Sequence, residues 1–123
     1  MSREAIALDA VRLLASQDGC RLWRNNVGAS RLENGSFVRW GLANETAAEN
    51  ARVKSGDLIG IRPVTITPAH LGMTLGLFVS REVKRAGWRY RGDAHEQAQQ
   101  NWIDIVRSFG GDAGFTTGEW VRS

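Results

Sequence analysis

The chain of 123 residues has the length of one domain, and its 42% hydrophobic and 24% charged residues are ordinary for a globular protein. This composition excludes an intrinsically disordered chain, and no uncharged apolar run approaches the ~18 residues of a membrane span. The charges of Arg3, Glu4 and Asp9 do not fit a signal peptide. One cysteine, Cys20, excludes an intrachain disulfide and a Cys-rich zinc site, so a reducing cytoplasm is the expected location.

Arginine dominates the positive charge of the chain. The 16 basic residues exceed the 13 acidic ones, which gives a net charge of +3, and only Lys54 and Lys84 are lysines. Arginine is favoured where planar, bidentate contacts with phosphate are made. An arginine-rich genome would produce the same bias, so the composition is only a hint of a nucleic-acid partner.

The first predicted element is a helix over residues 3–16, with Ser2 as N-cap and Gly19 beyond its end. Its apolar face consists of Ile6, Ala10, Leu13 and Leu14. Short strands are predicted over residues 20–24 and 36–40, and the Asn34-Gly35 turn before the second favours a hairpin. Trp23, Trp40 and Trp102 are expected in the core.

The second half begins with residues 43–55, which form a loop or a short helix, and a strand over 57–62. The strongest strand pattern covers residues 75–84, and its apolar N-terminal end is expected to be buried between layers. A helix over 94–108 follows, stopped by Gly110-Gly111, and then a strand over 113–115. The whole chain, 1–123, is therefore predicted to be one mixed α/β domain with a small sheet.

An acidic pair and a lysine carry the chemistry of the prediction. Side chains alternate along a strand, so Glu82 and Lys84 share one face where the strand emerges from the core. If the strands over 57–62 and 75–84 are antiparallel neighbours, Asp57 meets both of them. Two carboxylates beside a lysine suit Mg²⁺ and a phosphate. The alternative is an exposed Glu-x-Lys pair and an Asp that serves only as a turn residue.

The positive charge is concentrated in residues 81–92, which carry five basic residues and one acid. Trp88 and Tyr90 alternate with Arg89 and Arg91, a pattern that suits stacking on bases and contacts with phosphates. The alternative for Trp88 is packing back onto the body of the domain. Together with a second basic stretch over 21–31, this segment gives a set of candidate DNA-binding residues: Arg24, Asn25, Asn26, Arg85, Trp88, Arg89 and Arg91.

Other candidate sites are weaker. His95 stands at the start of a helix, where a histidine is more often solvated than catalytic. Cys20 has no identifiable histidine partner and is expected to be a buried structural thiol. No phosphate-binding loop of the Walker type occurs in the sequence.

Taken in order, several motifs resemble the PD-(D/E)XK nucleases, and more closely the stand-alone VRR-NUC nucleases often encoded by phages. They are Arg24-Asn25-Asn26-Val27-Gly28, Gly56-Asp57-Leu58-Ile59-Gly60, residues 76–84 ending in Glu82-Val83-Lys84, the helix with Gln99 and Trp102, and Gly110-Gly111. The resemblance covers residues 4–115. Gly56 stands where the motif has a proline, and under this resemblance the loop over 62–75 is interpreted as a family-specific insertion.

The resemblance implies a restriction-endonuclease-like core with the order α-β-β-β-α-β. It implies that Asp57, Glu82 and the Val83 carbonyl bind Mg²⁺ or Mn²⁺, that Lys84 is the catalytic lysine and that Gln99 supports the site. Glu4 matches an acidic position that completes the metal site, although an acid there also suits the dipole of a helix.

The implied function is a metal-dependent deoxyribonuclease, a homodimer that hydrolyses phosphodiester bonds of branched DNA such as a Holliday junction. The resemblance implies no membrane and no organic cofactor, and it places the protein in a bacterial or phage-infected cytoplasm. Two alternatives remain open: a non-catalytic nucleic-acid-binding module, and a subunit of a larger repair or packaging assembly.

Overall fold

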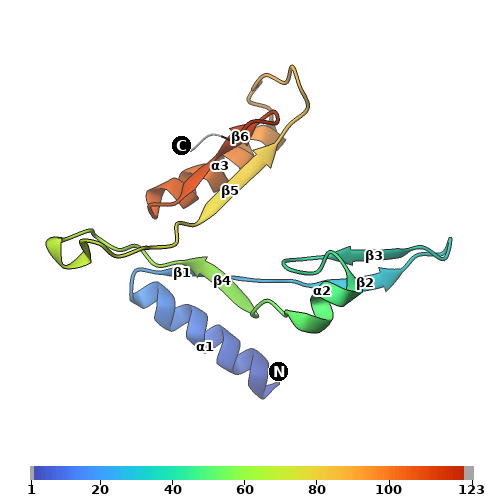
Figure 1. The fold of residues 1–123 in the computed structure, drawn as a ribbon, viewed down its shortest axis with the longest axis horizontal. Helices are drawn as coiled ribbons and strands as arrows, with labels where there is room; N and C mark the ends of the chain where they lie inside the picture. The colour runs from blue at the N-terminus through green and yellow to red at the C-terminus, as the bar shows by residue number, and fades with distance from the viewer. Residues whose placement is uncertain (1, 121–123) are drawn as a thin grey trace. The chain divides into compact units, whose positions relative to one another are not determined.

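The computed structural model describes residues 2–120. The chain divides into two compact units, Met1–Gly60 and Ile61–Ser123, which are described separately. Each unit combines helices with short paired strands, so the predicted mixed α/β class with small sheets is confirmed (Figure 1). The prediction of one domain stays a prediction. Within the described residues, no helix is both long and apolar enough to cross a membrane.

The first unit begins with α1 (Arg3–Gln17), close to the predicted bounds. The Ser2 hydroxyl accepts a hydrogen bond from the Ala5 amide at 3.1 Å, which confirms the predicted N-cap. The prediction of a buried apolar face on this helix is wrong, because Ile6, Leu13 and Leu14 are exposed. Half-buried residues lie instead on the face that includes Leu8, because apolar residues occur on several sides of this helix and periodicity alone cannot select one.

After α1 come the strands β1 (Arg21–Arg24), β2 (Gly28–Arg31) and β3 (Phe37–Trp40), then α2 (Ala47–Arg52) and the strand β4 (Leu58–Ile61), whose last residue begins the second unit. The hairpin at Asn34-Gly35 is confirmed, but β3 pairs with β2, which was not predicted as a strand. Gly35 has a φ of 87°, which the tight turn requires. β1 pairs with β4 instead.

The second unit contains η1 (Pro68–His70), β5 (Val79–Val83), α3 (Ala94–Ser108) and β6 (Asp112–Thr116). β5 and β6 are parallel, with Glu82 opposite Phe115, and α3 forms the crossover that packs on them (Figure 1). α3 contacts both strands, and three apolar residues of α3 and β6 are buried: Ile103, Val106 and Ala113.

The strand predicted over residues 75–84 is shorter than expected. β6 begins opposite Val79, so the residues before Phe78 have no strand partner in this pair. Leu75 and Leu77 are exposed, which corrects the prediction that this apolar end is buried between layers. At the start of the parallel pair, the Arg81 guanidinium instead contacts the buried Asp112 carboxylate at 2.8 Å. That ion pair joins β5 to β6.

Candidate functional site

Glu82, Lys84 and Gln99 form a cluster where β5 ends, and we call it the β5 cluster. The Lys84 ammonium donates a hydrogen bond to the Gln99 side-chain oxygen at 2.8 Å and lies 3.8 Å from the Glu82 carboxylate. The Lys84 backbone amide donates to the Thr116 carbonyl at 2.8 Å, which extends the parallel pairing by one residue. The structure therefore brings together three of the predicted site residues.

Burial separates the two charged members of the β5 cluster. The Lys84 side chain is 16% exposed and the Glu82 side chain is 40% exposed. The Lys84 ammonium also lies over the rings of Trp88, at 5.6 Å, and Phe115, at 5.9 Å from their centroids. These contacts hold the ammonium at one place, while the Glu82 carboxylate stays open to a ligand.

A pocket of about 280 Å³ lies beside the β5 cluster and is lined by Ser80, Glu82, His95, Ala98, Gln99 and Trp102. The Trp102 indole donates to the Ser80 hydroxyl at 2.9 Å, which ties α3 to β5 at its inner end. His95 is exposed, as predicted, yet it lines this pocket. His95 and Gln99 are four residues apart on α3. Residues at this spacing lie on the same face of a helix.

The basic loop after β5, residues 85–92, is anchored by a buried carboxylate that the sequence reasoning missed. Glu96 is 5% exposed and accepts hydrogen bonds from the Trp88 indole at 2.8 Å and from the amides of Arg91 and Gly92 at 2.8 and 3.0 Å. Burial alone would raise the pKa of Glu96, but hydrogen bonds from Arg91, Trp88, Gly92 and the Asp93 contact together lower it from its ordinary value of 4.5. The loop is thus held by an ionised carboxylate.

Trp88 packs onto the body of its unit, which is one of the two predicted alternatives. Its ring lies 4.8 Å from that of Phe115 and 6.3 Å from that of Tyr90, and the residue is half-buried. Arg85, Arg89 and Arg91 are exposed. The arginines of the loop are therefore exposed to solvent, while its aromatic rings are packed. DNA contact by these residues stays a prediction.

In the first unit, Asn25 holds the segment that carries Asp57. The Asn25 side-chain amide donates to the Ser55 hydroxyl at 2.7 Å and to the Gly56 carbonyl at 2.9 Å, and its backbone amide donates to the Asp57 carbonyl at 2.9 Å. These bonds give Asn25 a positioning role in addition to the predicted DNA contact. Arg24, Asn26 and Asp57 are exposed.

The predicted metal ligands are divided between the units. Glu82 and the Val83 carbonyl belong to the second unit, and Asp57 and Glu4, which is exposed in the first turn of α1, belong to the first. Among the described strands β4 pairs with β1 and β5 pairs with β6, so the expected antiparallel pairing of β4 with β5 is wrong. In residues 2–120, no group of three or more His, Cys, Asp or Glu side chains that could hold a metal is found. The meeting of Asp57 with Glu82 and Lys84 stays a prediction.

Comparison of the chain with models of protein families, with curated proteins and with solved structures finds no significant match. The resemblance to VRR-NUC nucleases therefore rests on the motifs of the sequence. The donor chemistry agrees with a hard cation, because an exposed carboxylate such as that of Glu82 is the group through which Mg²⁺ usually binds to proteins.

Three further side chains, those of Cys20, His70 and Trp40, lie outside the candidate site. Cys20 is half-buried rather than buried, which corrects the expectation of a buried thiol, and the thiol donates to the Asp18 carbonyl at 3.8 Å. His70 accepts the Thr67 amide at 3.0 Å and caps η1. Trp40 is exposed, which corrects its placement in the core, because β3 belongs to a hairpin rather than to a covered sheet.

Proposed function

We propose that this protein is a metal-dependent endonuclease that hydrolyses phosphodiester bonds of DNA, with branched DNA such as a Holliday junction as substrate. The observation that carries the proposal is the β5 cluster, in which a confined lysine stands beside an open carboxylate at the end of a strand. The basic loop over 85–92 follows the cluster directly in the chain and presents exposed arginines.

The role proposed for Lys84 follows from its confinement. A fixed positive charge stabilises negative charge that develops on a reacting phosphate better than a mobile one, because no reorganisation is needed during the reaction. The hydrogen bond to Gln99 and the contact with the Trp88 ring supply that fixation. Gln99 acts as a positioning residue, since its neutral amide directs the ammonium without cancelling its charge.

The role proposed for Glu82 is to hold the metal, together with the Val83 carbonyl, Asp57 and Glu4. A bound Mg²⁺ or Mn²⁺ would activate water and neutralise charge on the phosphate. Asn25 is proposed to keep the Asp57 carboxylate in place through its three hydrogen bonds to residues 55–57.

The order of elements supports the proposal. With β2, β3 and α2 regarded as an insertion, the remaining order is α1, β1, β4, β5, α3 and β6, which is the α-β-β-β-α-β order implied by the resemblance. The parallel crossover from β5 through α3 to β6 also agrees with that order. A homodimer in the cytoplasm is part of the same proposal.

A labelled four-way DNA junction tests this function. We expect cleavage with Mg²⁺ and none with a chelator, and we expect Glu82→Gln to lower the rate by about 10²–10³, the usual cost of removing one electrostatic contact in a site. Glu119→Gln is the matched control, because it removes an exposed carboxylate of the same unit. Equal rates for the two variants would contradict the assignment of Glu82.

The second candidate is a non-catalytic nucleic-acid-binding module, which is favoured by the exposed arginines of the basic loop. It predicts junction binding without cleavage at any metal concentration. Binding that survives Glu82→Gln while cleavage is absent in the unmodified protein would select this candidate.

A further inference from the structure

One face of the β2–β3 hairpin gathers cations around an exposed aromatic ring. The register pairs Arg31 with Phe37 and Ala29 with Arg39, and Phe37 and Arg39 are two residues apart on one strand. Side chains of paired residues, and of residues two apart, lie on the same side of a sheet. Arg31, Phe37 and Arg39 therefore share one face of the hairpin.

The aromatic ring holds both arginines. The Arg31 and Arg39 guanidinium carbons each lie 5.5 Å from the centroid of the Phe37 ring, and Phe37 is 54% exposed. An exposed phenylalanine of this kind is not explained by packing in the core. Its contacts restrict the two guanidiniums, so less side-chain entropy is lost when they bind a ligand.

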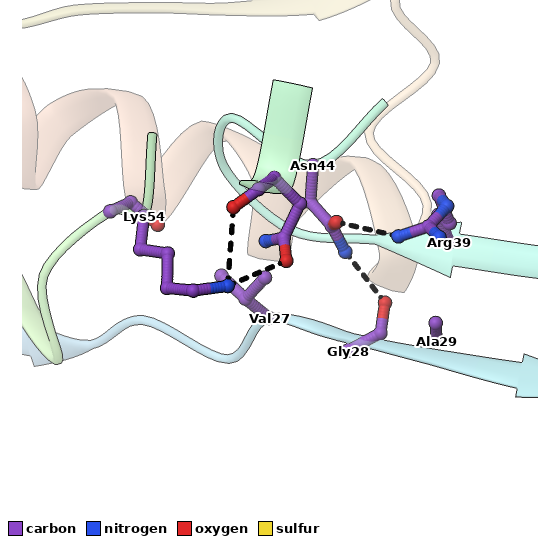
Figure 2. A pocket seen from close by; sticks show the side chains of 8 residues that line it. Val27, Gly28, Ala29, Arg39, Asn44 and Lys54 are labelled. Atoms are coloured by element: carbon purple, nitrogen blue, oxygen red, sulfur yellow. Dashed lines mark hydrogen bonds between the residues drawn. The ribbon is translucent and has the colours of Figure 1, made fainter. Parts of the chain in front are cut away.

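Arg39 also lines a pocket of about 330 Å³ (Figure 2). Arg39 and Lys54 extend toward Asn44 from either side, and both line the pocket. The Lys54 ammonium donates to the Asn50 carbonyl and side-chain oxygens at 3.1 and 2.8 Å. The described residues that line this pocket include these two cations and no carboxylate, so the lining carries a net positive charge.

A buried amide builds this pocket. Asn44 is 3% exposed, and its side-chain nitrogen donates to the Gly28 carbonyl at 2.7 Å and the Trp40 carbonyl at 2.9 Å. Its oxygen accepts from the Arg39 guanidinium at 3.1 Å. One side chain thus joins both strands of the hairpin and orients an arginine, and every polar atom of its amide is used.

We propose that Arg31, Phe37, Arg39 and Lys54, which we call the hairpin strip, form a second nucleic-acid-binding surface that contacts backbone phosphates. Residues 21–42 contain four arginines and one glutamate, so the surrounding segment is also positive. The cross-strand pair that contains Arg31 and the pair that contains Arg39 are two residues apart along the strands. At a rise of about 3.3 Å per residue, this separation is roughly 7 Å. A DNA strand presents a phosphate every ~3.4 Å along its axis, so the strip suits a polyanion rather than a single ion. This surface does not require catalysis.

The test is the salt dependence of DNA binding by the full chain, measured by anisotropy of a fluorescent duplex in the presence of a chelator. The double variant R31A/K54A removes two charges and leaves the bond between Arg39 and Asn44 intact. We expect about tenfold weaker binding at ~0.1 M salt and a slope of log K against log salt that is shallower by about 1.8. The matched control, R3A/R62A, removes two exposed arginines outside the strip and leaves the slope nearly unchanged.

Three results would overturn the proposal. One is an unaltered affinity and slope in R31A/K54A, and another is an equal loss in R3A/R62A, which would indicate only general attraction. The third is displacement of DNA by inorganic phosphate at constant ionic strength, which would indicate a site for a single anion. If the alanine variant does not fold, R31Q/K54Q against the charge-conserving R31K/K54R makes the same comparison. Because no metal is present, failure here leaves the nuclease proposal standing.

Discussion

The basic loop over 85–92 and the hairpin strip both place arginines beside aromatic rings, but they are held in different ways. A buried carboxylate, Glu96, anchors the loop through the Trp88 indole and two backbone amides. A buried neutral amide, Asn44, anchors the hairpin through two carbonyls and Arg39. The aromatic ring of the loop is packed and that of the hairpin is exposed. Similar basic surfaces can therefore differ in their response to acid, because only one anchor carries charge.

The largest expected effect on this comparison is loss of the loop anchor in Glu96→Gln. The amide nitrogen replaces one oxygen, so either the Trp88 indole or the amides of Arg91 and Gly92 then face a donor. Hydrogen exchange of the Arg91 and Gly92 amides is expected to accelerate by about an order of magnitude, because bonds to a charged acceptor are the stronger kind.

The hairpin is the internal reference for that experiment. Exchange of the β2 and β3 amides is expected to stay the same in Glu96→Gln, and Glu119→Gln is the control for loss of one carboxylate. Equal acceleration in the loop and the hairpin would refute a local anchor.

The converse change, Asn44→Ala, removes the anchor of the hairpin. The Gly28 and Trp40 carbonyls lose their donor, and the free energy of unfolding is expected to fall by about 1–3 kcal/mol. Urea denaturation measures the change. Asn26→Ala is the matched control, since Asn26 is exposed, and it is expected to alter stability by less than about 0.5 kcal/mol. A similar loss in both variants would argue against the role of Asn44.

Acid is expected to affect the basic loop and not the hairpin strip. The pKa of Glu96 is lower in the folded protein than its ordinary value of 4.5, so its contribution to stability is fully present above that value. It is lost as the pH falls through the lower pKa of the folded state. Trp88 fluorescence, read in a variant that lacks the other tryptophans, is expected to change below about pH 4.5 and to lose this transition in Glu96→Gln. A transition that persists in Glu96→Gln would assign it to another group.

The smallest expected difference between the two surfaces is in the salt dependence of their DNA binding. R89A/R91A in the loop is expected to weaken binding and to make the salt slope shallower by about 1.8, as in R31A/K54A. If both surfaces contact one DNA molecule, the combined variant shows the sum of the two changes. A combined slope no shallower than that of either double variant would mean that only one surface binds DNA at a time.

Parts of the fold with strong local patterns were predictable. The bounds of α3 agree with the prediction because Asp93 caps its start and Gly110, with a φ of 87°, follows its end. The hairpin turn at Asn34-Gly35 was predictable for the same local reason. β2 was not, since Gly-Ala-Ser-Arg has no alternation of apolar and polar residues and becomes a strand only by pairing with β3.

The candidate site shows the same division. The contact of Lys84 with Gln99 joins residues 15 positions apart, and the motif, rather than any local rule, indicated it. Glu96 was missed because an acid in the first turn of a helix usually serves the helix dipole, and its burial depends on how the loop folds back. The packing of α1 could not be chosen from a helix that is apolar on several sides. The joining of Asp57 with Glu82 requires contacts between distant segments, which strand patterns do not specify.

The most direct test of the account is the single-turnover rate of junction cleavage by D57N and K84A, with Arg3→Ala as control. The proposed reaction requires the side chains of both Asp57 and Lys84. It predicts that each variant loses about 10² or more of the rate while DNA binding in chelator is retained. Cleavage by D57N at the rate of the unmodified protein would contradict the proposed role of Asp57.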